Sequence, residues 1–245
     1  LKSGIQIPCE ELPSYTDYIE SETEYINSKR FLKDREYWNN KFETLPELTT
    51  LKTRVTSQTA TKARRKTFVA PEKFSKKLRE YCTENNVSPY VLFMSALCMY
   101  IYRISSKDEA VVGTPILNRS NIKEKNTMGM FINTSLLRVK IDGSANFKEF
   151  SEYISRECMS LLRHQKYPYD LLLKEVRKKF KTTSNLYDIV LSYQNNKLDS
   201  GRDGEQYRAR WHSNGHQTNS LTISINDREG EGSFIIDYDF HEDIY

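Results

Sequence analysis

The four histidines are candidates for chemistry, because imidazole titrates near neutrality and can serve as a general base or as a metal ligand. His212 and His216 stand four residues apart, which is the spacing of two ligands on one helical turn. Asn214 and Gly215 interrupt any helix there, and no acidic or sulfur ligand lies close by in the sequence. We therefore predict a polar loop at these residues and no metal site.

His164 is the other candidate base, and Asp170 could form a dyad with it. Pro168 lies between them, so a helix that contains His164 must end before Pro168 and the two side chains need not converge. A histidine at the C-terminal end of a helix also binds the last carbonyl groups and favours the negative end of the helix dipole. We favour this structural role.

Nucleophilic catalysis finds no support in the sequence. Ser135, Ser192 and Cys98 offer hydroxyl or thiol groups, but none lies in a nucleophile elbow or beside a recognisable base. We therefore expect neither serine nor cysteine catalysis.

Three polar residues with apolar neighbours, Asn133, Arg119 and Arg138, are candidates for a different role. Asn133 stands on a predicted strand, where a buried amide costs stability unless it is hydrogen-bonded. It therefore either ties the sheet to a loop or lines a polar passage. Arg119 and Arg138 could likewise either tie segments together or line a polar passage. An arginine that is buried is expected to need a carboxylate partner.

Hydrophobic periodicity predicts helices that alternate with strands at first and a more strand-rich end. A long amphipathic helix is expected over residues 14–42 and a polar connector over 44–62. Ser88 and Pro89 begin a helix to about residue 104 that is apolar on nearly every side and should lie at the centre of the fold. Further helices are predicted over residues 71–84, 147–164 and 168–180. Strands are predicted over residues 65–70, 109–116, 131–141, 187–194, 221–226 and 233–240, the last two as a hairpin. Together these elements predict an α/β fold on a mixed sheet.

Composition limits the class of protein. The net charge of +4 is mild, and no recognised nucleic-acid motif accompanies the basic runs at residues 62–66 and 177–181, so we expect no nucleic-acid partner. The longest apolar run, residues 91–102, is too short to span a bilayer. Four scattered cysteines without CxxC pairing suit a reducing compartment, and no secretory signal is visible. We expect a cytoplasmic protein without a membrane partner.

Four segments, in this order, resemble the motifs of the condensation domains of nonribosomal peptide synthetases. Residues 15–18 resemble a YxDYA-type motif, residues 128–138 a GxFVNTxxxR motif, and residues 164–170 an HQxYPFE motif. Residues 184–195 resemble a degenerate RDxSRNPLFD motif without its arginines and its proline. The residues to which the resemblance assigns a structural role are Tyr15, Asp17, Gly129, Phe131, Arg138, His164, Gln165, Pro168 and Asp170.

The resemblance implies a chloramphenicol-acetyltransferase-like half-domain of the α/β class, with helices packed on a mixed central sheet. In such enzymes two related lobes form a V, and the tunnel between them admits two phosphopantetheine arms that carry an acyl and an aminoacyl thioester. The HHxxxDG motif, whose histidine assists the attack of the amine, is absent from these 245 residues. The resemblance therefore implies a C-terminal lobe with no catalytic residue of its own, inactive alone.

The resemblance also implies how this lobe is organised. Residues 1–60 would form an N-terminal helix and connector, and residues 61–245 the lobe itself. Residues 113–128 would form a floor loop, and part of residues 196–219 a latch. The residues expected to line the tunnel or lie near substrate are Asn133, Arg119, Ser192 and Gln194.

The implied function is peptide-bond formation between carrier-bound acyl and aminoacyl thioesters. Its partners would be the N-terminal lobe of the same domain, upstream and downstream peptidyl carrier proteins, and a neighbouring adenylation domain. No cofactor would bind directly, since 4'-phosphopantetheine is supplied by the carriers. Three alternatives stay open: a non-catalytic carrier-binding scaffold module, an epimerisation-type domain, which usually differs at the Asn-Thr motif, and another acyltransferase of the superfamily that uses His164.

Overall fold

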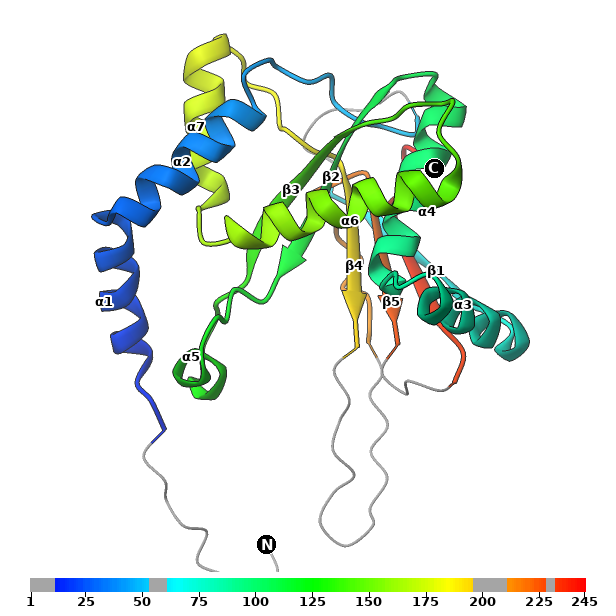
Figure 1. Cartoon of the computed structure of the whole chain (residues 1–245), viewed down its shortest axis with the longest axis horizontal. Helices are drawn as coiled ribbons and strands as arrows, with labels where there is room; N and C mark the ends of the chain where they lie inside the picture. The colour runs from blue at the N-terminus through cyan, green and yellow to red at the C-terminus, as the bar shows by residue number, and fades with distance from the viewer. Residues whose placement is uncertain (1–11, 53–60, 196–210, 228–231) are drawn as a thin grey trace, which may run out of the picture.

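A six-stranded sheet forms the centre of the protein (Figure 1). The computed structural model describes residues 12–52, 61–195, 211–227 and 232–245. The order of the strands across the sheet is β1-β6-β5-β4-β2-β3. Their bounds are β1 (Ala63–Val69), β2 (Glu109–Ile116), β3 (Asn133–Lys140), β4 (Ile189–Gln194), β5 (Leu221–Asn226) and β6 (Ile235–His241).

The sheet is mixed, which confirms the sequence prediction. β4 pairs in parallel with both β2 and β5, whereas β1 with β6, β5 with β6, and β2 with β3 are antiparallel pairs. The predicted hairpin partners β5 and β6 are in register, with Asn226 opposite Ile235. Because β2, β4 and β5 run in the same direction, their carboxyl ends lie at the same edge of the sheet.

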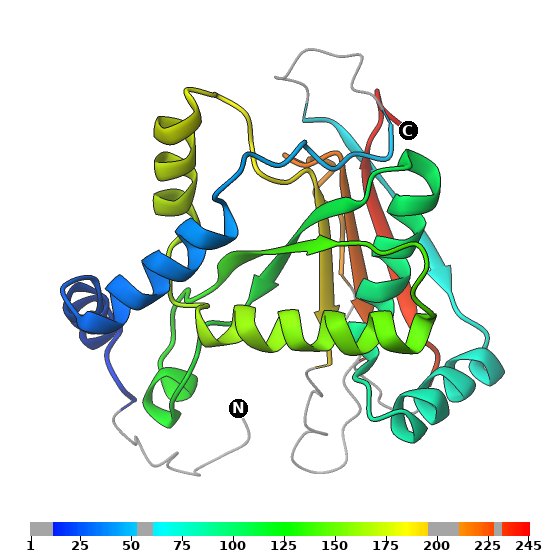
Figure 2. The ribbon, with the colours of Figure 1, turned by 45° about the horizontal axis from the view of Figure 1, so that its top comes forward.

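Two long helices, α4 (Pro89–Ser105) and α6 (Phe147–Arg163), lie across one face of the sheet (Figure 2). α4 begins where the sequence predicts, because the side chain of Ser88 accepts a hydrogen bond from the N–H of Val91 and Pro89 occupies the first turn. Seven residues of α4 are buried. α4 is therefore the central helix that its apolar sequence predicted.

The prediction of one long helix over residues 14–42 is wrong, because the chain forms two helices there, α1 (Tyr15–Ile26) and α2 (Lys29–Lys41). The side chain of Ser28 accepts a hydrogen bond from the N–H of Phe31 and caps α2. A serine that binds a backbone N–H favours a helix start over a helix interior, so the first helix ends and a new one begins.

Three shorter helices complete the described part of the chain: α3 (Glu72–Glu84), α5 (Ile122–Asn126) and α7 (Tyr169–Phe180). α5 lies between β2 and β3 and was not predicted. α7 packs against α2 and β3 (Figure 1). No single helix of the described residues has the length and apolar composition to cross a membrane, and α3 with α4 meet that condition only as a pair bent by 103°.

Three predicted strands begin two residues too early, since β3, β4 and β6 start at Asn133, Ile189 and Ile235. Before β3 and β6 the chain contains a buried phenylalanine, Phe131 (3% exposed) and Phe234 (0%) respectively. Their burial comes from packing outside the strand ladder, with Phe131 against aromatic rings of α1 and Phe234 against the Phe93 ring of α4. Buried apolar residues therefore continue past the residues that pair between strands. For this reason the apolar sequence pattern predicts strands that are longer than the observed ones.

Candidate functional site

An aromatic cluster joins α1 to the segment between β2 and β3. The ring centroids of Tyr15 and Tyr18 lie 5.7 and 3.9 Å from that of Phe131. The hydroxyl of Tyr15 donates a hydrogen bond of 2.7 Å to the carbonyl oxygen of Met130. The first two motif segments of the sequence therefore meet in space although more than a hundred residues separate them.

Gly129 permits this contact. Its φ of +150° is unusual for other residues, and a Cβ atom at this position would overlap the ring of Tyr15. The glycine of the second motif is thus required by the tyrosine of the first. Asp17, two residues after Tyr15, adds an ion pair of 3.0 Å with Lys123 of α5.

Arg119, which itself belongs to the segment between β2 and β3, fixes the backbone of that segment. Its guanidinium lies 3.9 Å from the centroid of the Phe131 ring and donates to the carbonyl oxygens of Glu124, Thr127 and Gly129. Arg119 is half-buried, and no carboxylate of the described residues forms an ion pair with it. Carbonyl groups and a π face therefore take the place of the carboxylate partner that the sequence suggested.

The segment between β2 and β3, residues 117–132, presents apolar side chains to solvent although these contacts hold it in place. Five of them are strongly exposed: Leu117 (56%), Ile122 (77%), Met128 (75%), Met130 (75%) and Ile132 (56%). An exposed apolar patch of this kind marks a surface that associates with another protein or a ligand. We call residues 117–132 the bare segment.

Asn133, the first residue of β3, ties the sheet to the turn between α6 and α7. Its Nδ2 donates hydrogen bonds of 2.9 Å to the carbonyl oxygens of Gln165 and Tyr167. This is the tie that the sequence offered as the first of two alternatives. Pro168 follows directly and occupies the N-cap position of α7.

His164 pairs with Asp34 of α2 and not with Asp170. The distance from His164 Nδ1 to Asp34 Oδ1 is 2.7 Å, and the Tyr37 ring stacks on the imidazole at 3.9 Å. Asp170 is exposed and lies 3.6 Å from Lys174. His164 is the C-cap of α6, as its structural role requires, but its ring binds a carboxylate and not a carbonyl group.

Sequence reasoning missed Asp34. Its carboxylate is fully buried and also accepts hydrogen bonds from Tyr25 (2.8 Å) and Arg30 (3.0 Å). Burial and the hydrogen bond to Asp34 raise the pKa of Tyr25, so its phenol remains a donor. An aspartate within a highly charged helix predicts a solvated face, and no local signal distinguishes Asp34 from its exposed neighbours.

Arg138 has the carboxylate partner that the sequence predicted. It binds Glu109 of β2 through two hydrogen bonds of 2.9 and 3.1 Å. It also donates to the carbonyl oxygens of Lys41 and Thr44 and to the hydroxyl of Thr44. Arg138 therefore fastens the end of α2 to the sheet.

The remaining predicted substrate-proximal residues, Ser192 and Gln194, lie near the end of β4. Because side chains alternate along a strand, both face the side of the sheet opposite to Tyr193. Tyr193 faces α4, where the Tyr90 ring lies 6.5 Å from its own. The four predicted residues are thus divided: Asn133 and Arg119 hold the turn after α6 and the bare segment, whereas Ser192 and Gln194 lie on β4.

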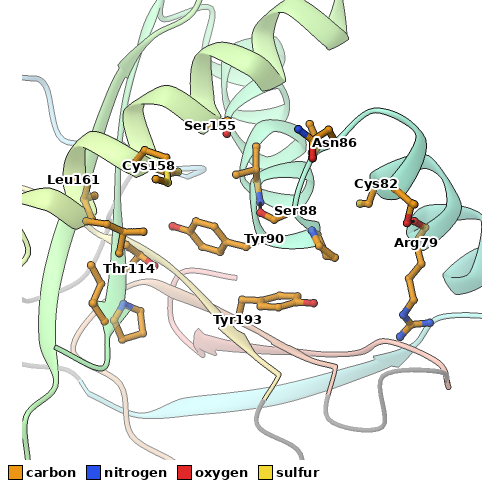
Figure 3. Close-up of a pocket in the computed structure, with 18 residues that line it drawn as sticks. Arg79, Cys82, Asn86, Ser88, Tyr90, Thr114, Ser155, Cys158, Leu161 and Tyr193 are labelled. Atoms are coloured by element: carbon orange, nitrogen blue, oxygen red, sulfur yellow. Dashed lines mark hydrogen bonds between the residues drawn. The ribbon is translucent and has the colours of Figure 1, made fainter. Parts of the chain in front are cut away.

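A cavity of about 890 Å³ lies between α4, α6 and the carboxyl ends of β2 and β4 (Figure 3). Its walls are mainly apolar. Thr114 belongs to the predicted floor loop, residues 113–128, and Tyr193 to the fourth motif segment, residues 184–195, but the sequence predicted no cavity between these residues and α6. The side chains that define it here are Tyr90, Thr114, Ser155, Cys158, Leu161 and Tyr193.

The ionisable groups in the wall of this cavity are uncharged near neutral pH or are paired. Burial raises the pKa of the Cys158 thiol to about 12 and raises the pKa values of the Tyr90 and Tyr193 phenols, since apolar surroundings disfavour the charged forms. Arg79 at the rim pairs with Asp227 at 2.5 Å. The cavity therefore offers apolar, mostly neutral surroundings.

Metal chemistry has no visible site in the part of the chain that the structure describes, where no three His, Cys, Asp or Glu side chains are placed to hold an ion. His212 and His216 lie outside helices, and His216 Nδ1 is 3.2 Å from the Thr61 hydroxyl. Part of the predicted latch, residues 196–210, lies outside the described residues.

The family model and the similar proteins of known sequence point to the same family. The family model of the condensation domain matches residues 1–245. Surfactin synthase subunit 1 of Bacillus subtilis is 36% identical over 232 residues, which are 95% of this chain and 6% of that protein. One subunit of the plipastatin synthase of the same organism is 32% identical over 246 residues, covering the whole chain and 10% of that protein.

Solved structures share the fold. The first condensation domain of the CDA synthetase superposes with a TM-score of 0.83 at 18% identity, over 98% of this chain and 52% of that one. The condensation domain of the Monacolin K polyketide synthase gives a TM-score of 0.82 at 17% identity, over 99% and 58%. The chain thus spans about half the length of the solved condensation domains and a tenth or less of these curated relatives.

Proposed function

The chain belongs to the condensation-domain family of nonribosomal peptide synthetases, and from this premise we propose that it forms the C-terminal lobe of a domain that joins two carrier-bound thioesters by a peptide bond. The lobe supplies one wall of the channel in which the amine of an aminoacyl thioester attacks an acyl thioester. The histidine that assists this attack belongs to the HHxxxDG motif of the other lobe, since this chain has no such motif.

One observation carries the proposal: the bare segment is held in a fixed position while its apolar side chains face solvent. Arg119 and Tyr15 bind its backbone, so its conformation does not depend on a partner. Yet Ile122, Met128 and Met130 are each at least 75% exposed. A fixed apolar loop at the end of β2 is suited to dock on a second lobe and close the floor of the channel.

The remaining partners follow from the family. We assign the acyl and aminoacyl groups to 4'-phosphopantetheine arms of upstream and downstream peptidyl carrier proteins, with an adenylation domain as neighbour. The three described cysteines are free and buried, which suits a reducing compartment and therefore the cytoplasm.

The test combines residues 1–245 with a separately produced N-terminal lobe that carries HHxxxDG. We expect the two lobes to associate and to form an amide from a donor and an acceptor thioester on their carriers, and the 245-residue chain alone to form none. Association is measured by sedimentation and product by mass spectrometry. Amide formation by the chain alone, or two lobes that stay apart, would refute the proposal.

A pair of variants locates the docking surface. Ile122→Asp places a charge in the bare segment, and Leu32→Asp places the same charge at an exposed apolar residue of α2 (59% exposed). Because both side chains are exposed, neither change should unfold the chain. We expect Ile122→Asp to weaken lobe association at least tenfold and Leu32→Asp to leave it unchanged.

A further variant decides between the proposal and an acyltransferase that uses His164 as its base. The imidazole is held by Asp34 and Tyr37, which suits a structural tie better than proton transfer. In the joined lobes, His164→Gln should therefore lower stability while the rate of amide formation per folded molecule stays within about threefold. Loss of all turnover in a folded His164→Gln protein would favour the acyltransferase.

A further inference from the structure

We propose that Lys166, in the turn between α6 and α7, is a positioning residue for amide formation, because its ion pair with Glu124 sets the place of the bare segment at the floor of the channel. This role rests on the proposed function, which assigns the bare segment to that floor. The HQxYPFE pattern leaves the position of Lys166 open, and Glu124 precedes the motif segment at residues 128–138. No motif of the sequence therefore marks the pair.

The helix α5, inside the bare segment, needs contacts with other elements to keep its position. It has five residues, and a helix of that length is not stable by itself in water. Figure 1 shows it at the end of a loop that extends away from the sheet. Hydrogen bonds from the backbone of α5 to Asn121 and from Arg119 to α5 stay within the segment, so they shape it without tying it to the sheet.

Glu124 provides a contact outside the segment. Its side chain is buried (6% exposed), whereas Ile122, two residues earlier on the same helix, is 77% exposed. Its Oε2 accepts hydrogen bonds from the backbone N–H and the hydroxyl of Ser120, and its Oε1 lies 3.2 Å from the Nζ of Lys166. A buried carboxylate needs such partners. The ion pair that holds Glu124 inside therefore keeps Ile122 on the outer side, where the other lobe would dock.

The backbone around Lys166 is fixed to the core. Asn133, at the start of β3, donates hydrogen bonds of 2.9 Å to the carbonyl oxygens of Gln165 and Tyr167, the residues on either side of Lys166. Tyr167 is 3% exposed, and its ring stacks on that of Phe31 in α2 at a centroid distance of 5.2 Å. Lys166 therefore extends from a firmly held turn and fixes α5 relative to the sheet.

Another ion pair, Asp17 of α1 with Lys123, holds the neighbouring residue of α5, but it is more exposed. The side chains of Asp17 and Lys123 are 43% and 62% exposed, whereas those of Glu124 and Lys166 are 8% and 34% exposed. Water and salt screen exposed pairs, so the pair of Glu124 and Lys166 should be the stronger tie. A displacement of about 1 Å near reacting groups can lower a rate about a hundredfold, so this tie should affect amide formation.

Hydrogen–deuterium exchange of the complete 245-residue chain tests the tie itself. In Lys166→Met, the backbone amides of residues 117–132 should exchange at least about fivefold faster than in the parent, while those of α4 and α6 keep the parent rate. Glu124→Gln should have the same effect, which keeps the test decisive if one variant does not fold. Unchanged exchange over residues 117–132 in the folded variants overturns the inference.

Two further variants serve as controls. Lys166→Arg keeps the charge and the donor, so its exchange should match that of the parent. Lys174→Met removes an exposed lysine of α7 that lies 3.6 Å from the exposed Asp170, and it should also match the parent. Faster exchange over residues 117–132 in Lys174→Met, equal to that in Lys166→Met, would mean that any loss of charge loosens the segment, and this overturns the inference.

Amide formation by the joined lobes tests the positioning role. With saturating carrier-bound substrates, Lys166→Met should lower kcat at least about tenfold and leave KM within about threefold, because its role involves the bare segment and not the carriers. Lys166→Arg should keep kcat within about threefold of the parent, and Lys174→Met should change neither constant. The double variant Lys166→Met with Glu124→Gln should be no slower than the slower single variant, since both remove one tie. An unchanged kcat, or a change confined to KM, overturns the inference.

These outcomes are separable from those of the proposed function. Parent lobes that associate but form no amide would reject the proposed function, and the exchange experiment would still decide whether Lys166 holds the segment. Parent lobes that form amide at a rate that Lys166→Met does not lower would reject the positioning role and keep the proposed function.

Discussion

The two sides of this lobe are built on different principles. Where α1, α2 and the turn after α6 meet β3 and the bare segment, polar side chains bind backbone groups and one another, as Arg138, Asn133 and Arg119 do. Between α4 and α6, apolar walls leave a cavity of about 890 Å³. Most residues that the family motifs mark lie on the first side, and Tyr193 of the fourth motif segment is the one motif residue among the six that define the cavity above.

Most of the motif residues bind other parts of the chain. Gly129 fits the ring of Tyr15, His164 binds Asp34, and Arg138 anchors the end of α2. Each is a tie between segments distant in sequence, so its loss should cost stability first. The cavity residues, by contrast, border empty space, so their substitution should have little effect on stability. The following predictions, measured as free energies of unfolding in urea, test this contrast from its largest to its smallest expected effect.

Arg138→Met should be the most damaging change. It leaves the Glu109 carboxylate and the carbonyl groups at the end of α2 without their partner. Breaking a buried pair from one side costs about 3–5 kcal/mol, and because the Glu109 side chain is 26% exposed we expect the lower limit, about 3 kcal/mol. The double variant Arg138→Met with Glu109→Gln should recover part of the loss, because the unpaired charge is gone. A loss below about 1 kcal/mol in the single variant would contradict the role of Arg138 as an anchor.

Gly129→Ala should cost about 2 kcal/mol, because the added methyl group meets the Tyr15 ring at a strained backbone position. Gly215→Ala is the matched control: this glycine also has a positive φ (+76°), but a Cβ there meets nothing within 4 Å. The free energy of unfolding of Gly215→Ala should fall by about 1 kcal/mol, which is the cost of an alanine at a positive φ without a steric overlap. Equal losses in both variants would show that contact with α1 does not explain the motif glycine.

Asp34→Asn should cost about 1.5 kcal/mol, since the anionic acceptor of the hydrogen bonds from His164 and Arg30 is replaced by a neutral amide and the ion pair with Arg30 is lost. Asp17→Asn, in the exposed pair with Lys123, serves as control and should change stability by less than about 0.5 kcal/mol. A silent Asp34→Asn variant would mean that α2 is held by apolar packing alone.

Glu124 should give the segment between β2 and β3 a dependence on pH. Burial by itself raises its pKa, but hydrogen bonds from Ser120 and Lys166 outweigh burial and hold the pKa below its ordinary value of 4.5. A carboxyl group with a lowered folded-state pKa stabilises the fold above its unfolded-state pKa, and this contribution is lost as pH falls through the folded-state value. Glu124→Gln should therefore be about 1 kcal/mol less stable than the parent at pH 7, and the difference should shrink as the pH falls through the lowered folded-state pKa of Glu124. A difference independent of pH would exclude this ion pair as its source.

Ser155→Trp should change stability least, by about 0.5 kcal/mol, because the new ring enters existing space and displaces no packed group. This result would separate the cavity wall from the ties around β3. A loss comparable to that of Arg138→Met would show that the cavity wall is as tightly packed as the rest of the core.

Local sequence was sufficient for most of the secondary structure and for the fold class. Ser88 with Pro89 predicted the start of the central helix, and alternation of apolar residues predicted all six strands of the described sheet within a few residues. These predictions succeed because capping and periodicity depend on neighbours in the chain. They failed at Ser28, whose capping side chain divides a long apolar edge into two helices, and at α5, which is too short to show a period.

Local patterns in the sequence were enough to predict most of the helices and strands and the α/β class, because capping and periodicity depend on residues close together in the chain. Only the tertiary structure decided that Asp34 and not Asp170 binds His164, that carbonyl groups surround Arg119, and that α4 and α6 leave a cavity beside Tyr193. The Asp34–His164 contact and the cavity join segments that are tens to more than a hundred residues apart, and the carbonyl groups around Arg119, 5 to 10 residues further along the chain, belong to an irregular segment without a period. Which of the many polar and apolar side chains converge is set by how helices pack on the sheet in three dimensions, and local pattern carries no information about that packing.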